Sequence, residues 1–248
     1  MSLNPIDLKR FAILLDVDGT ILDIAPTPSD VEVPDSLRTT LRRVAERAGG
    51  ALALVSGRPL RELDAIFAPL RLAAIGGHGA EIRIASDSAS LRSSAPLDAA
   101  LKDELKTIAR KFPGVTLEDK GYSVAMHYRA RPALGPTLMR KLRDLRRARS
   151  EHPIELLSGK AVIEVKIAGF NKGTAVRELM AHPPFVGRVP ICIGDDVTDE
   201  DAFAVMPEFD GIAISVGRKV AGVYGRFQTP ADVRNWLDRI AHDAVLSS

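Results

Sequence analysis

The sequence of 248 residues predicts an α/β fold in which an inserted α+β domain interrupts a doubly wound parallel sheet. Short apolar runs alternate with helical patterns at both ends of the chain, as they do in βαβ units. Segments in the middle alternate apolar and polar residues, which is typical of an antiparallel sheet with one solvated face. We therefore expect a Rossmann-like core from residues 1–85 and 169–248, with an α+β insertion at residues 86–168.

The N-terminal part carries the first strands of the parallel sheet. A helix is predicted at 35–48, because apolar residues share one face and Gly49-Gly50 follows as a stop. Pro59 suits the first turn of the next helix. The predicted strands around these helices are residues 11–15, 51–55 and 72–75. This βαβαβ order indicates parallel strands with right-handed crossovers.

The insertion begins at residues 86–96, which are rich in Ser, Ala and Asp, as linkers are. Leucines at helical spacing predict two helices, at 97–112 and around 138–145. The predicted strands are residues 115–117, 123–128 and 161–167. We interpret the basic segment 140–149 as a solvated helix face, with a substrate patch as the alternative.

The parallel pattern resumes near residue 174. Strands are predicted at 189–193 and 211–215. The helices predicted around them are residues 174–181, 200–205 and 230–240.

Composition bounds the function. With 34 basic and 32 acidic residues, the charge offers no general case for nucleic-acid binding. The single cysteine, Cys192, excludes an internal disulfide, and its apolar surroundings suggest a core residue. The first apolar run is too short for a signal peptide, and no run approaches the roughly 20 residues of a membrane span. We expect a cytoplasmic protein that does not bind membranes.

Two clusters of carboxylates follow predicted buried strands. Asp16-Val17-Asp18-Gly19-Thr20 follows the first strand, and Gly194–Asp201, with five acidic residues, follows the strand at 189–193. Ligands of open parallel sheets bind beyond the carboxyl ends of the strands. Carboxylates brought together there repel one another unless a cation lies between them, so the pattern predicts a site for a divalent metal that binds a phosphate group of the substrate. Ser56-Gly57-Arg58 and Asn171-Lys172-Gly173 occupy similar positions.

These four segments, taken in their order along the chain, resemble the four motifs of the haloacid dehalogenase-like phosphatases. More narrowly, the chain resembles the trehalose-6-phosphate phosphatases from about residue 11 to residue 237. The segments that carry the narrower resemblance are Leu54–Arg58, Gly77–Glu81, Ala125–Arg129, Gly159-Lys160 with Glu164 and Lys166, and Gly194–Asp201. The resemblance implies hydrolysis of trehalose 6-phosphate with Mg²⁺, through an aspartyl-phosphate, beneath a cap formed by the insertion.

The resemblance implies a role for each motif residue. Asp16 is the expected nucleophile and Asp18 the general acid and base, with the Thr20 hydroxyl fixing Asp18. Ser56 and the Gly57 amide would bind phosphate oxygens, although Ser56 also suits helix capping. Lys172 would supply a fixed positive charge.

The expected metal ligands are the Asp16 carboxylate, the Asp18 carbonyl and Asp195. Mg²⁺ keeps several waters, so few protein ligands suffice. Asp196 and Asp199 are expected to hold metal-bound waters or Lys172.

A second group of residues is expected to bind the substrate. Glu164 and Lys166 share one face of a strand, which suits either sugar hydroxyls or a solvated ion-pair face. Arg58 could contact the substrate or form a structural ion pair. His78 could approach the ligand or be a loop histidine whose hydrogen bonds are satisfied within the protein. The expected substrate-binding residues are Thr20, Gly57, Arg58, His78, Glu81, His127, Arg129, Lys160, Glu164 and Lys166.

Two other functions stay open at this point. One is a phosphatase for another sugar phosphate, such as sucrose 6-phosphate or a hexose phosphate. The other is a non-catalytic sugar-phosphate-binding module that regulates a trehalose-6-phosphate synthase, which is also the expected protein partner.

Overall fold

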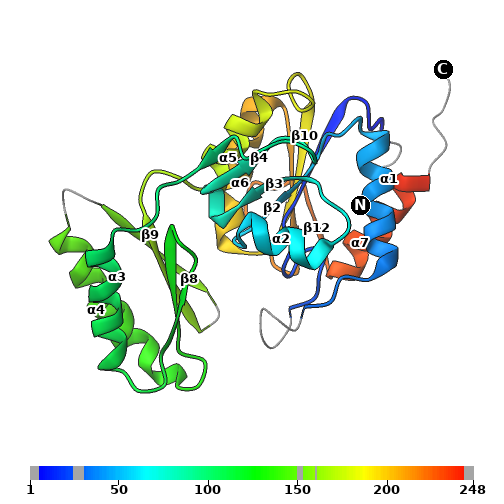
Figure 1. Ribbon diagram of the computed structural model, residues 1–248. Helices are drawn as coiled ribbons and strands as arrows, with labels where there is room; N and C mark the ends of the chain where they lie inside the picture. Colours follow the sequence, from blue (N-terminus) through cyan, green and yellow to red (C-terminus); the bar gives the residue numbers. More distant parts are fainter. Residues whose placement is uncertain (1–5, 25–30, 150–152, 160, 243–248) are drawn as a thin grey trace. The chain divides into compact units, whose positions relative to one another are not determined.

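The computed structural model describes residues 6–24, 31–149, 153–159 and 161–242 (Figure 1). The chain divides into two compact units, a core unit of Met1–Ser93 with Asn171–Ser248 and an inserted unit of Ser94–Phe170. The insertion was predicted to begin at residue 86 and end at residue 168. Residues 86–93 instead belong to the core unit, because Arg92–Ser93 pairs with a core strand.

The core unit contains an eight-stranded sheet with the order β12-β11-β10-β1-β2-β3-β4-β5. Its parallel strands are β1 (Phe11–Leu15), β2 (Leu52–Val55), β3 (Ala73–Gly76), β10 (Val189–Gly194), β11 (Ile212–Val216) and β12 (Gly225–Phe227). Two short antiparallel strands, β4 (Glu81–Arg83) and β5 (Arg92–Ser93), extend the edge next to β3. The predicted fold class, a parallel α/β core, is confirmed. The short strands β4, β5 and β12 were not predicted, because two or three residues show no period.

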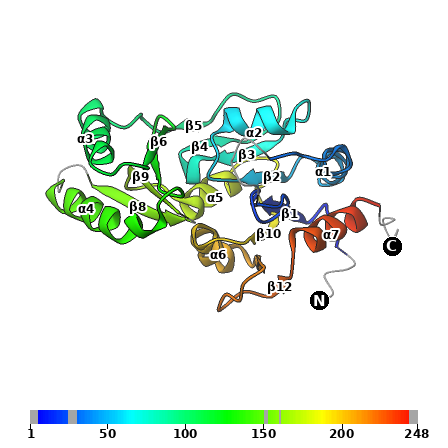
Figure 2. The same cartoon turned by 90° about the horizontal axis from the view of Figure 1, so that it is seen from below.

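Helices cover both faces of this sheet. In both views α1 (Asp35–Arg47) lies beside α7 (Pro230–His242), and the two helices pack together (Figures 1 and 2). On the other face α5 (Lys172–Met180) packs against α6 (Glu200–Val205) (Figure 1). The remaining core helix, α2 (Leu60–Phe67), contacts β3. This arrangement is the one expected when crossovers run in both directions from β1.

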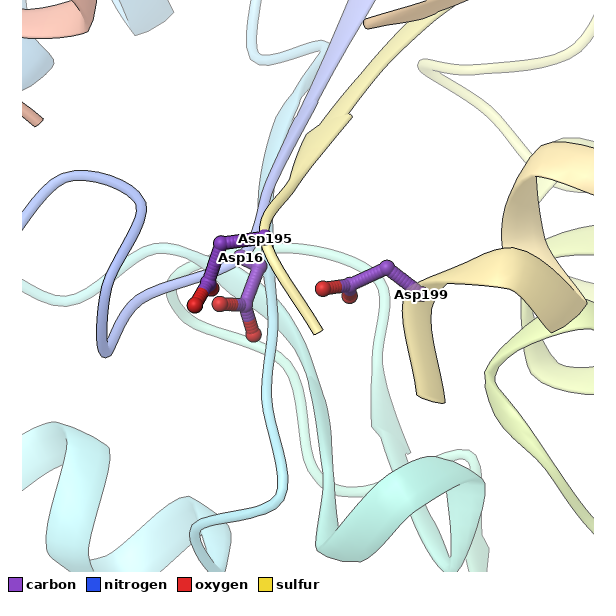
Figure 3. A group of neighbouring side chains, drawn as sticks. All are labelled: Asp16, Asp195 and Asp199. Carbon is purple, nitrogen blue, oxygen red and sulfur yellow. The ribbon is translucent and has the colours of Figure 1, made fainter. Parts of the chain in front are cut away.

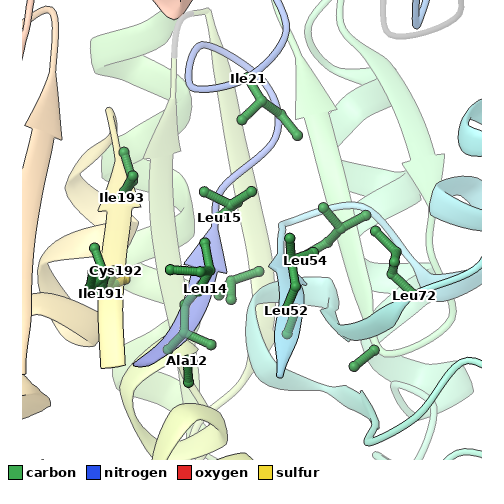
Figure 4. Close-up of a cluster of buried hydrophobic side chains, with 14 of the residues drawn as sticks. Ala12, Leu14, Leu15, Ile21, Leu52, Leu54, Leu72, Ile191, Cys192 and Ile193 are labelled. Atoms are coloured by element: carbon green, nitrogen blue, oxygen red, sulfur yellow. The ribbon is translucent and has the colours of Figure 1, made fainter. Parts of the chain in front are cut away.

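The central strands are buried on both faces, as strands covered by helices must be. Every residue from Ala12 to Leu15 in β1 is fully buried, and Leu52 and Ile193 beside it are too (Figure 4). Cys192 belongs to the same apolar cluster, as its sequence context predicted (Figure 4). The residues after these strands are therefore held on a rigid base.

The inserted unit is an antiparallel sheet with helices on one face. Its strand order is β6 (Thr116–Asp119), β7 (Ser123–His127), β9 (Val162–Ile167) and β8 (Ile154–Gly159). The helices α3 (Ala99–Arg110) and α4 (Gly135–Ala148) bury leucines such as Leu105 and Leu138 against Met126 and Val165. Strand β8 was missed, because adjacent leucines at 156 and 157 break its alternation.

Within the described ranges, no helix has both the length and the apolar character to cross a bilayer. The cytoplasmic location stays a prediction.

Candidate active site

Three aspartates from two loops converge at the carboxyl end of the core sheet. Asp16 directly follows β1, and its amide donates a 2.9 Å hydrogen bond to the carbonyl of Ile193 in the neighbouring strand β10. Asp195 follows β10, so the register of the two strands brings both side chains together (Figure 3). Asp199 points toward them from the short helical turn Val197–Asp199 (Figure 3). One carboxylate oxygen from each of the three lies within 4.8 Å of the others.

Lys172 is the buried cation of this cluster. Its Nζ donates to Asp16 Oδ1 at 2.7 Å and to Asp199 Oδ1 at 2.6 Å. The residue begins α5, whose start is fixed by a reciprocal capping box between Asn171 and Thr174. Burial by itself would lower the pKa of Lys172, but the charges of Asp16 and Asp199 raise it above its ordinary value. Lys172 therefore stays protonated throughout the physiological range.

The carboxylates outnumber this cation. Burial, followed by the charge of Asp199, raises the pKa of Asp16 well above its usual range, and Lys172 only partly opposes this. Burial and Asp199 also raise the pKa of Asp195. A hard divalent cation between Asp16 and Asp195 would remove this penalty, because carboxylate oxygens are the ligands that Mg²⁺ prefers. The donor set therefore fits a magnesium site.

The turn after Asp16 is shaped by close packing. Gly19 has a φ of +86°, and a Cβ there would lie 2.2 Å from Asp195 Oδ2. The Thr20 hydroxyl lies 3.1 Å from Asp16 Oδ2 and 3.0 Å from Asp195 Oδ1. Thr20 was expected to fix Asp18. It contacts Asp16 and Asp195 instead, because the turn folds its side chain back toward the strand ends.

Asp18 is held by Arg58. The guanidinium donates through Nε to Asp18 Oδ2 at 2.7 Å and through a terminal nitrogen to Asp18 Oδ1 at 2.8 Å. A bidentate pair of this kind fixes the carboxylate in orientation as well as in position. The structure thus gives Arg58 an ion-pair partner within the motif, which was one of its two predicted roles.

The loop after β2 brings Ser56 and Gly57 to His78. The carbonyl of Ser56 accepts from the amide of His78 at 3.0 Å, and a Cβ on Gly57 would lie 2.4 Å from the imidazole. Ser56 Oγ accepts from the Arg58 amide at 3.1 Å, so this bond does not use the serine O–H as a donor. The start of α2 is satisfied by Glu81, whose Oε2 accepts from the Leu60 amide at 2.8 Å. Glu81, predicted near the sugar, therefore has a capping role in this structure.

Hydrogen bonds between its own residues hold the loop after β10 in shape. Asp199 Oδ2 accepts from the Asp196 amide at 2.9 Å, and Asp196 Oδ1 accepts from the Val197 amide at 2.7 Å. Asp199 is buried and pairs with Lys172, whereas Asp196 is exposed.

Glu164 and Lys166, two of the predicted sugar-binding residues, alternate on β9 with Ile163 and Val165, which pack in the cluster with α3 and α4. The two charged residues therefore lie on the opposite face of the sheet. Glu164 accepts from Ser123 Oγ at 2.6 Å and from Lys120 Nζ at 3.0 Å. Lys166 pairs with Glu155 at 2.5 Å and donates to the carbonyl of Phe170. The contacts of Lys120 and Ser123 with Glu164 were not predicted, because strand register decides which side chains meet.

Three further predicted residues lie in the same unit. His127 Nε2 is 2.9 Å from Glu118 Oε2, and the His127 hydrogen bond helps to lower the pKa of Glu118. Arg129 is exposed at the end of β7. Lys160 lies outside the described residues. The sugar-binding role of all these residues stays a prediction.

Comparisons with known proteins agree on one family. The family model described as trehalose-phosphatase matches residues 14–233. The trehalose-6-phosphate phosphatase of Escherichia coli (strain K12) is 36% identical over 234 residues, which cover 93% of this chain and 86% of that protein. The probable trehalose-phosphate phosphatase of Sinorhizobium fredii is 41% identical over 215 residues, 86% of this chain and 80% of that protein.

The fold is also shared with a solved structure. The C-terminal domain of trehalose-6-phosphate phosphatase from C. albicans has a TM-score of 0.82 at 24% identity, over 94% of this chain and 92% of that one. At that identity the likeness concerns the fold, and the sequence relatives carry the family assignment. By its match to the family model and by these relatives, the chain belongs to the trehalose-phosphatase family.

Proposed function

We propose that the chain hydrolyses trehalose 6-phosphate to trehalose and phosphate, with Mg²⁺ held at the aspartate cluster. The observation that carries this proposal is the Asp16 carboxylate, which is fixed at a strand end between Lys172 and Asp195. A carboxylate held in this way can attack phosphorus, and the family supplies the sugar phosphate.

The reaction has two displacements at phosphorus. In the first, an Asp16 oxygen bonds to phosphorus while the bond to the sugar oxygen breaks, and Asp18 donates a proton to that oxygen. In the second, water attacks the aspartyl-phosphate, Asp18 takes a proton from the water, and the Asp16 carboxylate is released with free phosphate. One residue serves both steps, because donating the first proton leaves Asp18 ready to accept the second.

The remaining charges serve to offset the negative charge of the phosphoryl group. Bound Mg²⁺ would neutralise this charge and fix the geometry of attack, with ligands from the Asp16 and Asp195 carboxylates and the Asp18 carbonyl. Lys172 favours the carboxylate form of Asp16 and presents a second positive charge. Ser56 and the Gly57 amide provide neutral donors for phosphate oxygens.

Asp18 and Arg58 must change partners during this cycle. Both Asp18 carboxylate oxygens accept hydrogen bonds from Arg58, so neither is free to exchange a proton with the sugar oxygen or with water while that pair is intact. We infer that Arg58 holds Asp18 before substrate binds and moves to the substrate or aside when Asp18 takes up its proton.

We further propose that the insertion reads the sugar through Glu164 and Lys166, with Ser123 and Lys120 fixing the Glu164 carboxylate. A trehalose-6-phosphate synthase as partner and a cytoplasmic location are proposals that rest on the resemblance alone.

A substrate profile tests the proposed function. Purified chain with Mg²⁺ should release phosphate from trehalose 6-phosphate with a much higher kcat/KM than from sucrose 6-phosphate or glucose 6-phosphate. Asp16→Asn, which keeps the shape of the side chain, should release none. A preference for another sugar phosphate would overturn the substrate assignment. Binding of trehalose 6-phosphate without turnover would favour the regulatory module.

A further inference from the structure

Arg218 lies beside the aspartate cluster without being one of the motif residues. It follows β11, which pairs with β10 in parallel, with Gly194 opposite Ser215. The loops after these two strands are therefore neighbours at the carboxyl edge of the sheet. One of them carries Asp195, and the other carries Arg218.

The Arg218 guanidinium holds the main chain of the acidic loop. Its Nε donates to the Asp195 carbonyl at 2.7 Å, and a terminal nitrogen donates to the Asp196 carbonyl at 2.9 Å. The same nitrogen forms a 2.6 Å ion pair with Glu200. Two successive carbonyls held by one planar group fix the orientation of the peptide that leaves Asp195.

Arg218 is itself held in place. Its carbonyl accepts from the hydroxyl of the buried residue Ser215 at 2.9 Å, and its amide donates to the Val216 carbonyl at 2.7 Å. The backbone of Arg218 is thus fixed before any ligand binds, so positioning its side chain costs little conformational entropy when the ligand arrives.

The acidic loop needs such support. Asp195, Asp196, Asp199, Glu200 and Asp201 lie within seven consecutive positions, and their mutual repulsion favours a more open loop. The Asp195 carboxylate has little freedom to move, because it approaches Gly19 so closely that no side chain fits there. Because the side chain turns with its peptide, a rotation of the Asp195 peptide would take the carboxylate out of this close fit and away from Asp16.

We propose that Arg218 is a positioning residue of the metal site, which holds the Asp195 and Asp196 carbonyls so that the Asp195 carboxylate faces Asp16. The inference rests on the proposed magnesium site. Groups that orient metal ligands in this way typically contribute roughly ten- to a hundredfold in metal affinity or activity. Arg218 does not touch the reacting atoms, so its effect appears first in metal affinity.

The test measures metal binding directly. Mn²⁺ is titrated into the full chain, and free Mn²⁺ is followed by electron paramagnetic resonance for the wild type and for Arg218→Ala, Arg218→Lys, Glu200→Gln and Arg177→Ala. Arg177 is the matched control, because its guanidinium makes a bidentate ion pair on the surface with Glu208, which lies beyond the acidic loop in the chain. Phosphate release as a function of Mg²⁺ gives an activation constant for each variant.

Arg218→Ala should raise the Mn²⁺ dissociation constant and the Mg²⁺ activation constant by about tenfold or more, while excess Mg²⁺ restores most of kcat. Arg218→Lys should be intermediate, because an ammonium cannot reproduce the fork of the guanidinium. Glu200→Gln should have a smaller effect than Arg218→Ala, since the carbonyl contacts remain. Arg177→Ala should match the wild type.

Unchanged Mn²⁺ affinity in folded Arg218→Ala would overturn the inference, as would an equal loss in Arg177→Ala or Glu200→Gln. If Arg218→Ala does not fold, Arg218→Gln decides on the same criterion. A wild-type chain that is folded and binds no Mn²⁺ would overturn the metal site itself, and the inference with it. Failure of the inference alone would leave wild-type binding and turnover intact.

Discussion

Asp16 depends on its neighbours for its charge. Burial and two other aspartates raise its pKa, whereas Lys172 at 2.7 Å opposes that shift. The proposed nucleophile must be unprotonated, so the residues that matter most around it are those that supply positive charge. Lys172 provides one such charge in the protein itself, and the proposed Mg²⁺ provides the rest.

Gly19 allows a residue-scale test of the contact between the two loops. Gly19→Ala should lower kcat/KM by about a hundredfold. The added Cβ would lie 2.2 Å from Asp195 Oδ2, so the Asp195 carboxylate would have to move, and displacing an active-site group by about 1 Å typically lowers the rate by this factor. Gly187→Ala is the matched control, since Gly187 has a φ of +77° with no atom within 4 Å of its Cβ position. Both variants should lose about 1–2 kcal/mol of stability from the positive φ, measured by urea unfolding. Similar kinetics in the two would show that crowding at Asp195 does not matter.

At the scale of elements, the alternation of side chains along strand β9 determines which charged groups share a surface. Glu164 and Lys166 alternate with the buried residues Ile163 and Val165, so the same strand contributes to the core of the inserted unit and to its charged face. Ser123 on β7 lies opposite Lys166 and donates to Glu164, which ties the two strands together on that face.

Removing the Glu164 carboxylate tests the role of this face. Glu164→Ala should lower kcat/KM for trehalose 6-phosphate by roughly ten- to a hundredfold, the loss of one charged hydrogen bond, and should barely change hydrolysis of a small aryl phosphate. Lys102→Ala is the control, because Lys102 forms its ion pair with Asp119 from helix α3. Equal losses on both substrates would mean that Glu164 supports the fold of the insertion through Lys120 and Ser123 instead of reading the sugar.

At the scale of the whole molecule, the charged cluster of the site affects the stability of the fold. The eight-stranded sheet collects the loops after β1, β2 and β10 at one edge, and the packed core beneath them holds four acidic or basic groups close together. Without a metal, the raised pKa values of Asp16 and Asp195 mean that the native state binds protons more tightly than the unfolded chain. The contribution of these two carboxyls to the stability of the metal-free protein should therefore fall as pH rises above about 4, the ordinary carboxyl value.

Mg²⁺ should reverse this loss. In urea unfolding, Mg²⁺ at about a hundred times its dissociation constant should add about 2.7 kcal/mol to the free energy of unfolding. At one fixed Mg²⁺ concentration the gain should be larger at pH 8 than at pH 5, because protons compete with the metal for the carboxylates and weaken its binding at the lower pH. Asp195→Asn should remove most of the gain. An equal gain in Asp195→Asn would place the bound metal elsewhere.

Local patterns in the sequence predicted most of the longer strands and helices, because burial on one or both faces leaves a period in the chain, but they missed β8, whose adjacent leucines break the alternation. They also predicted that the carboxylates of Asp16 and Asp195 follow strands of one parallel sheet. The short strands β4, β5 and β12, and with them the start of the insertion, left no such period.

Several pairings within the site were decided by tertiary structure alone. Position in the chain does not reveal that Arg58 holds Asp18, that Thr20 contacts Asp16 and Asp195, or that Glu81 caps α2. Arg218 is the clearest case, since it lies 23 residues beyond Asp195 and meets it only because β11 adds beside β10. A single sequence specifies which groups are present and which strand ends carry them, whereas strand order and register determine which of those groups come within hydrogen-bonding distance.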